Sequence, residues 1–82
     1  MQTIEQRINK IVAYHLAVKE SDIKPDSNLE DDLGADSLDL IEILMVMEDE
    51  FDVEISDEDG GKVKTVQQAV DLITKHPHVN VS

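Results

Sequence analysis

The segment GADSLD, residues 34–39, contains Ser37, the serine of this chain that is best placed to be covalently modified. Asp36 is the better candidate to cap a helix that begins here, which would leave the Ser37 hydroxyl free to point outward. A helix N-terminus presents unpaired N–H groups and partial positive charge, so it tolerates a phosphate ester even among acidic residues. The pattern therefore predicts a modification point at Ser37. The alternative is that Ser37 is only a capping or first-turn serine, which is a common helix feature.

Other groups that could do chemistry are few. The chain has no cysteine, which removes disulfides, thiolate metal ligands and a cysteine nucleophile. Its histidines are His15, in a region with helical periodicity, and His76 and His78 near the end. Sequence distance alone does not decide against a serine–histidine pair, but so small a chain offers little room for a water-excluding pocket. We therefore predict no enzymatic activity, and no metal site at the two terminal histidines.

The acidic run around Gly60 and Gly61 does not fit a calcium loop. An EF-hand needs acidic or amide ligands at loop positions 1, 3 and 5, glycine at 6 and glutamate at 12. With Gly60 at position 6, Ile55 and Val66 fall at positions 1 and 12. With Gly61 there, position 12 is Gln67. A dedicated calcium site is therefore not expected, while weak divalent binding by crowded carboxylates stays open.

Charge limits the classes of partner. The 82 residues carry a net charge of −12, and fourteen of the nineteen acidic residues lie between Glu30 and Asp59. Residues 25–61 contain no Lys or Arg. Binding to nucleic acid or to an anionic membrane is not expected, because no basic surface is available to neutralise phosphates. The acidity favours either simple solubility or the attraction of basic protein partners.

The hydrophobic pattern predicts a single all-α domain over residues 1–82, with a core of about 3–76 and a frayed tail at 77–82. Helices are expected over 4–17 and 37–51, and from 66 to about 75; capping boxes at Thr3 and Thr65 begin the first and last. A short helical turn is expected within 56–62. The long segment 19–35 is predicted to be a packed loop, anchored by Leu29 and Leu33. Without a leader-like or membrane-spanning apolar run, we expect a cytoplasmic protein that does not insert into membranes.

The predicted helix over residues 37–51 has two apolar sides. One is predicted to face the core and comprises Leu40, Ile43, Leu44, Met47 and Phe51. The other is a displaced strip with an acidic border, which comprises Leu38, Ile41 and Met45 beside Glu42, Glu48 and Asp49. A wide buried face would explain this strip, and so would an exposed surface on which a partner docks.

The stretch Asp31-Asp32-Leu33-Gly34-Ala35-Asp36-Ser37-Leu38-Asp39 resembles the attachment motif of the acyl carrier proteins of bacterial type II fatty acid synthesis. Residues 4–7, 48–55 and 64–67 also resemble that family, in the family's order, so the resemblance covers almost the whole chain except the tail. It implies a four-helix bundle with three main helices, a short third helix and a long loop between helices 1 and 2.

The resemblance also implies a function. Ser37 would carry 4′-phosphopantetheine, transferred from coenzyme A by a phosphopantetheinyl transferase. The thiol of this arm would hold growing acyl chains as thioesters and carry them between the enzymes of fatty acid biosynthesis, with the protein acting as a monomeric carrier and not as an enzyme. These enzymes have basic surfaces, and the docking residues implied on this chain are Asp36, Leu38, Asp39, Ile41, Glu42, Met45, Glu48 and Asp49.

Two departures and two other interpretations accompany the resemblance. Ser56 stands where many relatives have proline, and two glycines stand where helix-favouring residues are usual, so we predict a short or mobile third helix. A carrier for a polyketide, a specialised lipid or an aminoacyl group is one other interpretation, although Gly34-Ala35-Asp36 favours the fatty acid branch. The second is a non-covalent acidic protein that buffers cations or regulates a basic partner.

Overall fold

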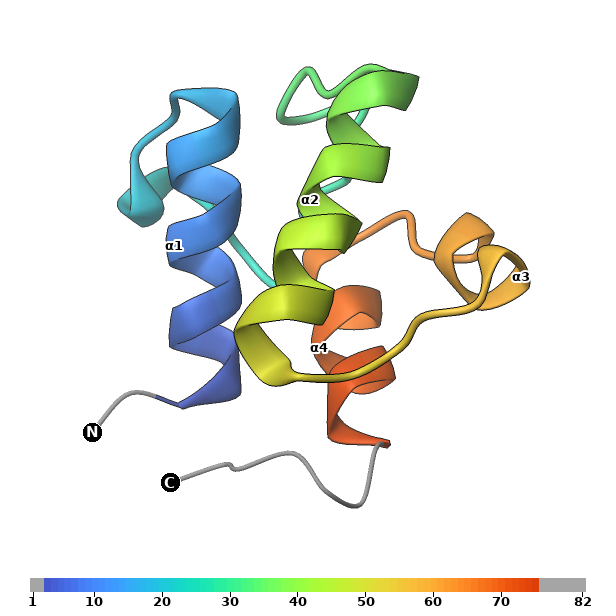
Figure 1. The fold of residues 1–82 in the computed structure, drawn as a ribbon. Coiled ribbons are helices and arrows are strands. Elements are labelled where there is room, and N and C mark those ends of the chain that lie inside the picture. Colours follow the sequence, from blue (N-terminus) through green and yellow to red (C-terminus); the bar gives the residue numbers. More distant parts are fainter. Residues whose placement is uncertain (1–2, 76–82) are drawn as a thin grey trace.

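The computed structural model describes residues 3–75, which fold into helices joined by loops, with no strand in that range. The helical elements are α1 (Ile4–Leu16), the 3-10 helix η1 (Glu20–Asp22), α2 (Ser37–Phe51), α3 (Asp57–Gly61) and α4 (Val66–Thr74). In Figure 1, α1 and α2 lie side by side, and α3 lies apart at the edge of the domain; α4 packs against α1. The predicted all-α bundle with a short third helix and a long loop between helices 1 and 2 is confirmed. The expected tail at 77–82 and both His76 and His78 lie outside the described residues.

Both predicted capping boxes form. The Thr3 hydroxyl accepts from the Gln6 N–H at 3.1 Å, and the Gln6 side chain accepts from the Thr3 N–H at 2.9 Å. Thr65 and Gln68 repeat the arrangement at the start of α4, with distances of 3.2 and 3.0 Å. Because each box satisfies backbone donors with side chains only three residues away, both starts are fixed locally.

Helix α1 ends one residue before its predicted end at 17. Ala17 adopts a left-handed conformation with φ 57°, which stops the helix at Leu16. Asp52 does the same after α2, with φ 55°. Helices commonly end on such a residue, and glycine is favoured there because it has no Cβ to clash. The prediction overran because alanine, a strong helix former, stands at the position that ends the helix.

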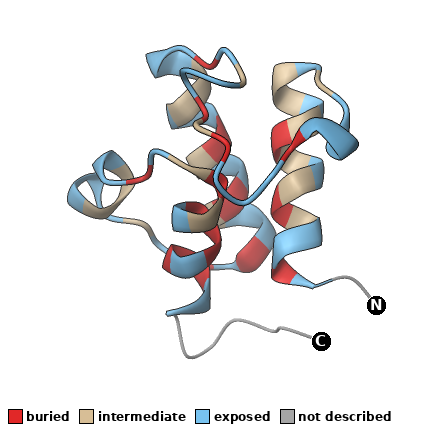
Figure 2. Cartoon of the chain, turned by 180° about the vertical axis from the view of Figure 1, so that it is seen from behind, coloured by how far each residue is buried: buried red, intermediate tan, exposed pale blue. Residues whose placement is uncertain are grey.

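The core lies between α1, α2 and α4 and is almost entirely aliphatic. Ile8, Ile43, Met47 and Ile73 are at most 1 % exposed. Figure 2 shows the buried residues on the sides of the helices that face one another. At one end of this core the Arg7 guanidinium lies 4.4 Å from the centre of the Phe51 ring, which places a cation over the face of an aromatic ring.

The predicted packed loop is held by the segment that leads into α4. The Leu29 N–H donates to the Lys64 carbonyl at 2.9 Å, and the Gln67 N–H donates to the Pro25 carbonyl at 2.8 Å. Leu29 is buried, and Leu33 is half-buried against the core, as expected. The loop thus has a fixed path, and it delivers the chain to the start of α2.

Helix α3 is one short helix, and Ser56 caps it by accepting from the Asp59 N–H at 3.1 Å. Gly60 lies directly over Leu44 of α2: a Cβ at that position would sit 3.0 Å from Leu44 Cδ1. The short length of α3 matches the prediction, and the mobility expected for residues 56–62 stays a prediction.

Within residues 3–75, no helix is long and apolar enough to cross a membrane.

The left-handed conformation of Ala17 predicts that Ala17→Gly raises the free energy of unfolding by about 1 kcal/mol, because glycine adopts this conformation without a Cβ clash. Urea unfolding followed by circular dichroism measures the change. Lys10→Gly, at an exposed position inside α1, is the matched control and should lower the free energy of unfolding by a similar amount. A loss of stability in Ala17→Gly would contradict the proposed role of this residue.

Candidate functional site

Two aspartates begin α2 and cap it reciprocally. Asp36 Oδ1 accepts from the Asp39 N–H at 2.8 Å, and Asp39 Oδ2 accepts from the Asp36 N–H at 3.1 Å. Asp36 is therefore the N-cap, as the sequence predicted, and Ser37 occupies the first helical position. The capping role that a serine could have taken here is filled by its neighbour.

The Ser37 hydroxyl is exposed and makes no hydrogen bond to any of residues 3–75. Just before it, Gly34 turns the chain with φ 78°, a conformation that side chains with a Cβ rarely adopt. Ala35 is then buried, so the chain runs inward before α2 begins. The result is an accessible nucleophilic oxygen at the positive end of a helix of fifteen residues.

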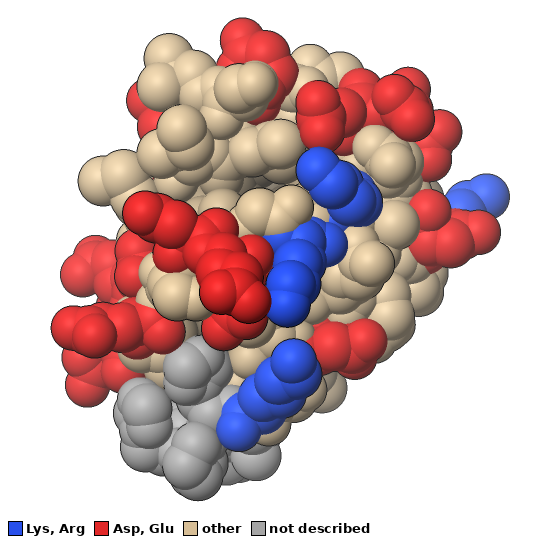
Figure 3. Space-filling model, turned by 90° about the vertical axis from the view of Figure 1, so that its right-hand side faces the viewer, with Lys and Arg blue, Asp and Glu red and all other residues tan. Residues whose placement is uncertain are grey.

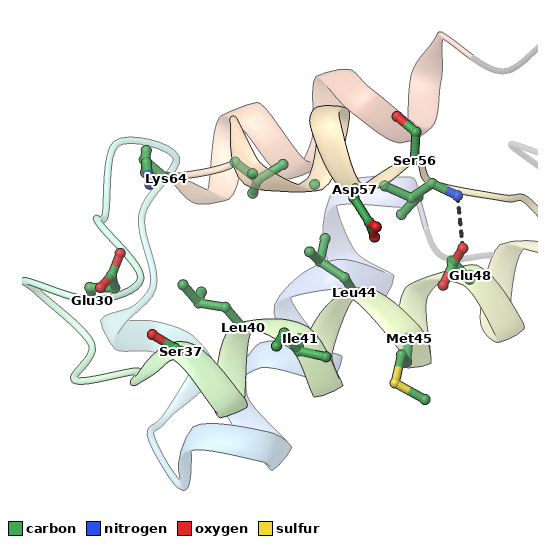
Figure 4. Close-up of a pocket in the computed structure, with 14 residues that line it drawn as sticks. Glu30, Ser37, Leu40, Ile41, Leu44, Met45, Glu48, Ser56, Asp57 and Lys64 are labelled. Carbon is green, nitrogen blue, oxygen red and sulfur yellow. Dashed lines mark hydrogen bonds between the residues drawn. The ribbon is translucent and has the colours of Figure 1, made fainter.

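Ser37 lies at one end of an open pocket of about 500 Å³. Its apolar lining comes from α2 and from the segments on either side of α3, and comprises Leu40, Ile41, Leu44, Met45, Ile55 and Val63. Figure 4 shows Leu40 and Leu44 rising from α2 toward α3, while Met45 points to the other side of the helix. Glu30, Glu48, Asp57 and Lys64 add charged groups to the lining.

Leu40 and Leu44 separate this pocket from the core. Both are half-buried, and both also line a second, nearly closed cavity of about 10 Å³ among Val12, Ile43 and Met47. Of the predicted core side of α2, Ile43, Met47 and Phe51 are buried, while these two leucines form the wall between pocket and core.

The second apolar strip of α2 faces solvent. Leu38, Ile41 and Met45 are 62 %, 55 % and 60 % exposed. The alternative of a wide buried face is therefore wrong for these residues. Val46 is also 42 % exposed on the same helix, which the sequence analysis did not anticipate. Several large apolar side chains exposed together on one helix are typical of an interaction surface.

The acidic border of this strip, which also includes Asp36 and Asp39 at the start of α2, is unevenly exposed. Asp36, Glu42 and Asp49 are exposed, whereas Asp39 and Glu48 are half-buried. Glu48 Oε2 accepts from the Ile55 N–H at 2.8 Å, so this carboxylate holds the connection between α2 and α3 (Figure 4). On the face seen in Figure 3, acidic side chains lie on both sides of a narrower band of Lys and Arg.

The structure brings His15 together with two of the docking residues implied by the resemblance, Asp39 and Glu42. His15 Nε2 of α1 lies 2.9 Å from Glu42 Oε1 and 3.8 Å from Asp39 Oδ1 of α2. The helical spacing contained a signal for this: His15 stands three residues after Val12 and seven after Ile8, both buried, so it belongs to the side of α1 that faces the domain. The contact partner on α2 could not be read from that spacing.

Two comparisons with known proteins bear on this site. Residues 6–73 match the model of the family described as the phosphopantetheine attachment site. Among solved structures, the chain is similar to the acyl carrier protein from Enterococcus faecalis, a protein described for its high thermal stability. The two are 40 % identical, the match covers 88 % of this chain and 91 % of the other, and the TM-score is 0.76.

The division of roles between Asp36 and Ser37 predicts different effects on stability. Asp36→Ala should lower the free energy of unfolding by about 1 kcal/mol, because it removes the acceptor for the Asp39 N–H. Ser37→Ala should change it by less than about 0.5 kcal/mol, since the exposed hydroxyl has no hydrogen bond to lose within the described part of the chain. Urea unfolding of both variants makes the comparison, with Asp36→Asn as the capping control. An equal loss in the two alanine variants would show that Ser37 is part of the cap.

Proposed function

The chain belongs to the acyl carrier proteins, the family with a phosphopantetheine attachment site, and from this premise we propose that Ser37 carries the arm on which acyl chains are moved between enzymes of fatty acid biosynthesis. A protein of this family is a carrier and not an enzyme, and its cofactor is covalent 4′-phosphopantetheine. One observation carries the choice of residue: Ser37, whose hydroxyl has no hydrogen-bond partner among residues 3–75, is exposed at the N-terminus of α2, where an apolar pocket begins.

The start of α2 suits a phosphodiester on Ser37. The backbone N–H groups of the first turn of a helix favour a nearby anion, and the reciprocal cap of Asp36 and Asp39 uses only part of that capacity. Asp36 also keeps the hydroxyl available, because it takes over the capping bond. When bound, the prosthetic group supplies the thiol that forms the thioester, which this cysteine-free chain cannot supply itself.

The pocket beside Ser37 suits an acyl chain. Its apolar lining would remove methylene groups from water, which stabilises a bound chain by about 0.8 kcal/mol for each buried CH₂. Leu40 and Leu44 are flexible aliphatic side chains between this pocket and the small core cavity. Their rotation would let a longer chain extend toward the core, and Gly60 leaves the room above Leu44 that a side chain would fill.

The exposed side of α2 suits docking to basic enzymes. Leu38, Ile41 and Met45 supply apolar contact, and the acidic docking residues are Asp36, Asp39, Glu42, Glu48 and Asp49. A phosphopantetheinyl transferase and the fatty acid synthesis enzymes are the partners we propose, with acyl chains as cargo. The charge of −12 accelerates encounter with positive surfaces. We propose that the protein works as a monomer in the cytoplasm.

Attachment at Ser37 predicts a change in intact mass. After incubation with coenzyme A, Mg²⁺ and a phosphopantetheinyl transferase, the protein should gain the mass of one phosphopantetheinyl unit, measured by mass spectrometry. Ser37→Ala should gain none, because the accepting oxygen is absent. Ser56→Ala removes another helix-capping serine and should still gain one unit. A folded wild-type protein that gains no mass with an active transferase would leave the non-covalent acidic regulator as the better explanation.

Docking through the exposed strip predicts that Ile41→Ser lowers kcat/KM for the transferase reaction by about tenfold, because the apolar contact made on binding is lost. Initial rates at several protein concentrations measure this. Tyr14→Ser is the matched control: Tyr14 is 90 % exposed but lies on α1, so its removal should leave kcat/KM unchanged. Equal losses in the two variants would indicate that docking does not use the strip on α2.

A further inference from the structure

One imidazole and two carboxylates from different helices converge beside the start of α2. Within residues 3–75, His15, Asp39 and Glu42 are the one group of three or more such side chains whose ligand atoms lie close enough to share a metal ion, all within 4.8 Å of one another. His15 comes from the last turn of α1, and the two acidic residues lie three apart on α2. The group therefore joins two helices.

The distances suit a tetrahedral ion. Zinc binds histidine nitrogen and carboxylate oxygen at about 2.0–2.2 Å, so two ligand atoms of a tetrahedral site lie about 3.4 Å apart. His15 Nε2 lies 2.9 Å from Glu42 Oε1 and 3.8 Å from Asp39 Oδ1, one shorter and one longer than that separation. The ligand atoms of Asp39 and Glu42 lie within 4.8 Å of each other, and rotation of these two side chains would bring all three groups to bonding distance.

The ligands are held from outside the group. Asp39 Oδ2 accepts from the Asp36 N–H at 3.1 Å, so the other oxygen, Oδ1, is the one turned toward His15. Hydrogen bonds of this kind orient a ligating carboxylate and are a usual part of metal sites. The His15 side chain is only 21 % exposed, while that of Glu42 is 47 % exposed. One side of the group therefore stays open to water, which could complete the coordination.

The imidazole selects the kind of ion. Ca²⁺ and Mg²⁺ prefer sites made of oxygen, whereas imidazole nitrogen together with carboxylate oxygen suits Zn²⁺. No Lys or Arg occurs in residues 25–61, so the negative potential around α2 attracts cations. We propose that His15, Asp39 and Glu42 form a Zn²⁺ site that joins α1 to α2.

Zinc at this site would change the surface used for docking. Asp39 and Glu42 belong to the acidic border of α2, so a bound dication would neutralise two of its charges; this consequence rests on the proposed function. The proposal that Zn²⁺ binds at this site does not rest on the proposed function. The site uses no atom of Ser37, and it can be studied on Ser37→Ala, which cannot be loaded.

The test is a competition titration of the full-length Ser37→Ala protein with Zn²⁺ against a chromophoric chelator. We expect one ion per chain and an affinity that falls at least about tenfold in His15→Gln, because a nitrogen ligand is lost. Glutamine keeps a donor for the hydrogen bond to Glu42. Glu42→Gln is the second variant and should also weaken binding. The matched control is the double variant His76→Gln and His78→Gln, which removes two other histidines and should bind Zn²⁺ unchanged.

Three results would overturn the site. They are a Ser37→Ala protein that does not bind Zn²⁺, an affinity that falls in the His76 and His78 double variant but not in His15→Gln, and displacement of Zn²⁺ by an equal concentration of Ca²⁺. The last would show that carboxylates alone hold the ion. If His15→Gln proves unfolded by circular dichroism, unchanged binding in folded Glu42→Gln overturns the site in its place. Attachment of phosphopantetheine to Ser37 is measured separately by mass spectrometry. A negative result in the Zn²⁺ titration therefore would not contradict the proposed carrier function.

Discussion

The reciprocal hydrogen bonds between Asp36 and Asp39 are the interaction on which the site depends. They begin α2 at Ser37, and they satisfy backbone donors without using the serine hydroxyl. The same bonds fix which oxygen of Asp39 faces His15. The accessible Ser37 hydroxyl, our proposed attachment point, and the ordered carboxylate beside it thus have one cause, a cap made by two acidic side chains.

Helix α2 serves two environments at once. Its inner side carries Ile43, Met47 and Phe51 into the core, and its outer side exposes a row of large apolar residues. Between them, Leu40 and Leu44 are half-buried and line the pocket. Stability depends on the inner side, the docking that we propose uses the outer side, and the two leucines line the pocket between them. If the arm begins at Ser37, as we propose, one helix combines core packing, the docking surface and the wall of the pocket.

Local features could be predicted from the sequence, and contacts between distant segments could not. The boxes at Thr3 and Thr65, the cap at Asp36 and the short α3 each depend on residues a few positions apart. The end of α1 was missed because a left-handed alanine has no signature in composition. The sequence analysis assigned Glu48 only to the docking surface. In the structure its carboxylate accepts a hydrogen bond from the Ile55 N–H, and this contact depends on the path of the segment after α2, which the sequence does not specify. The meeting of His15 with Asp39 and Glu42 required the packing of α1 on α2.

The hydrogen bonds between the long loop and the segment at the start of α4 have a consequence for the order in which the chain folds. Leu29 and Pro25, which precede Ser37, are held by Lys64 and Gln67, which follow it by about thirty residues. The cap of α2 is local and can form early, but the path leading to it depends on contacts far apart in sequence, which form slowly. During synthesis, the serine emerges from the ribosome long before the segment that secures its approach. Its final geometry is therefore completed only when the last helix has been made.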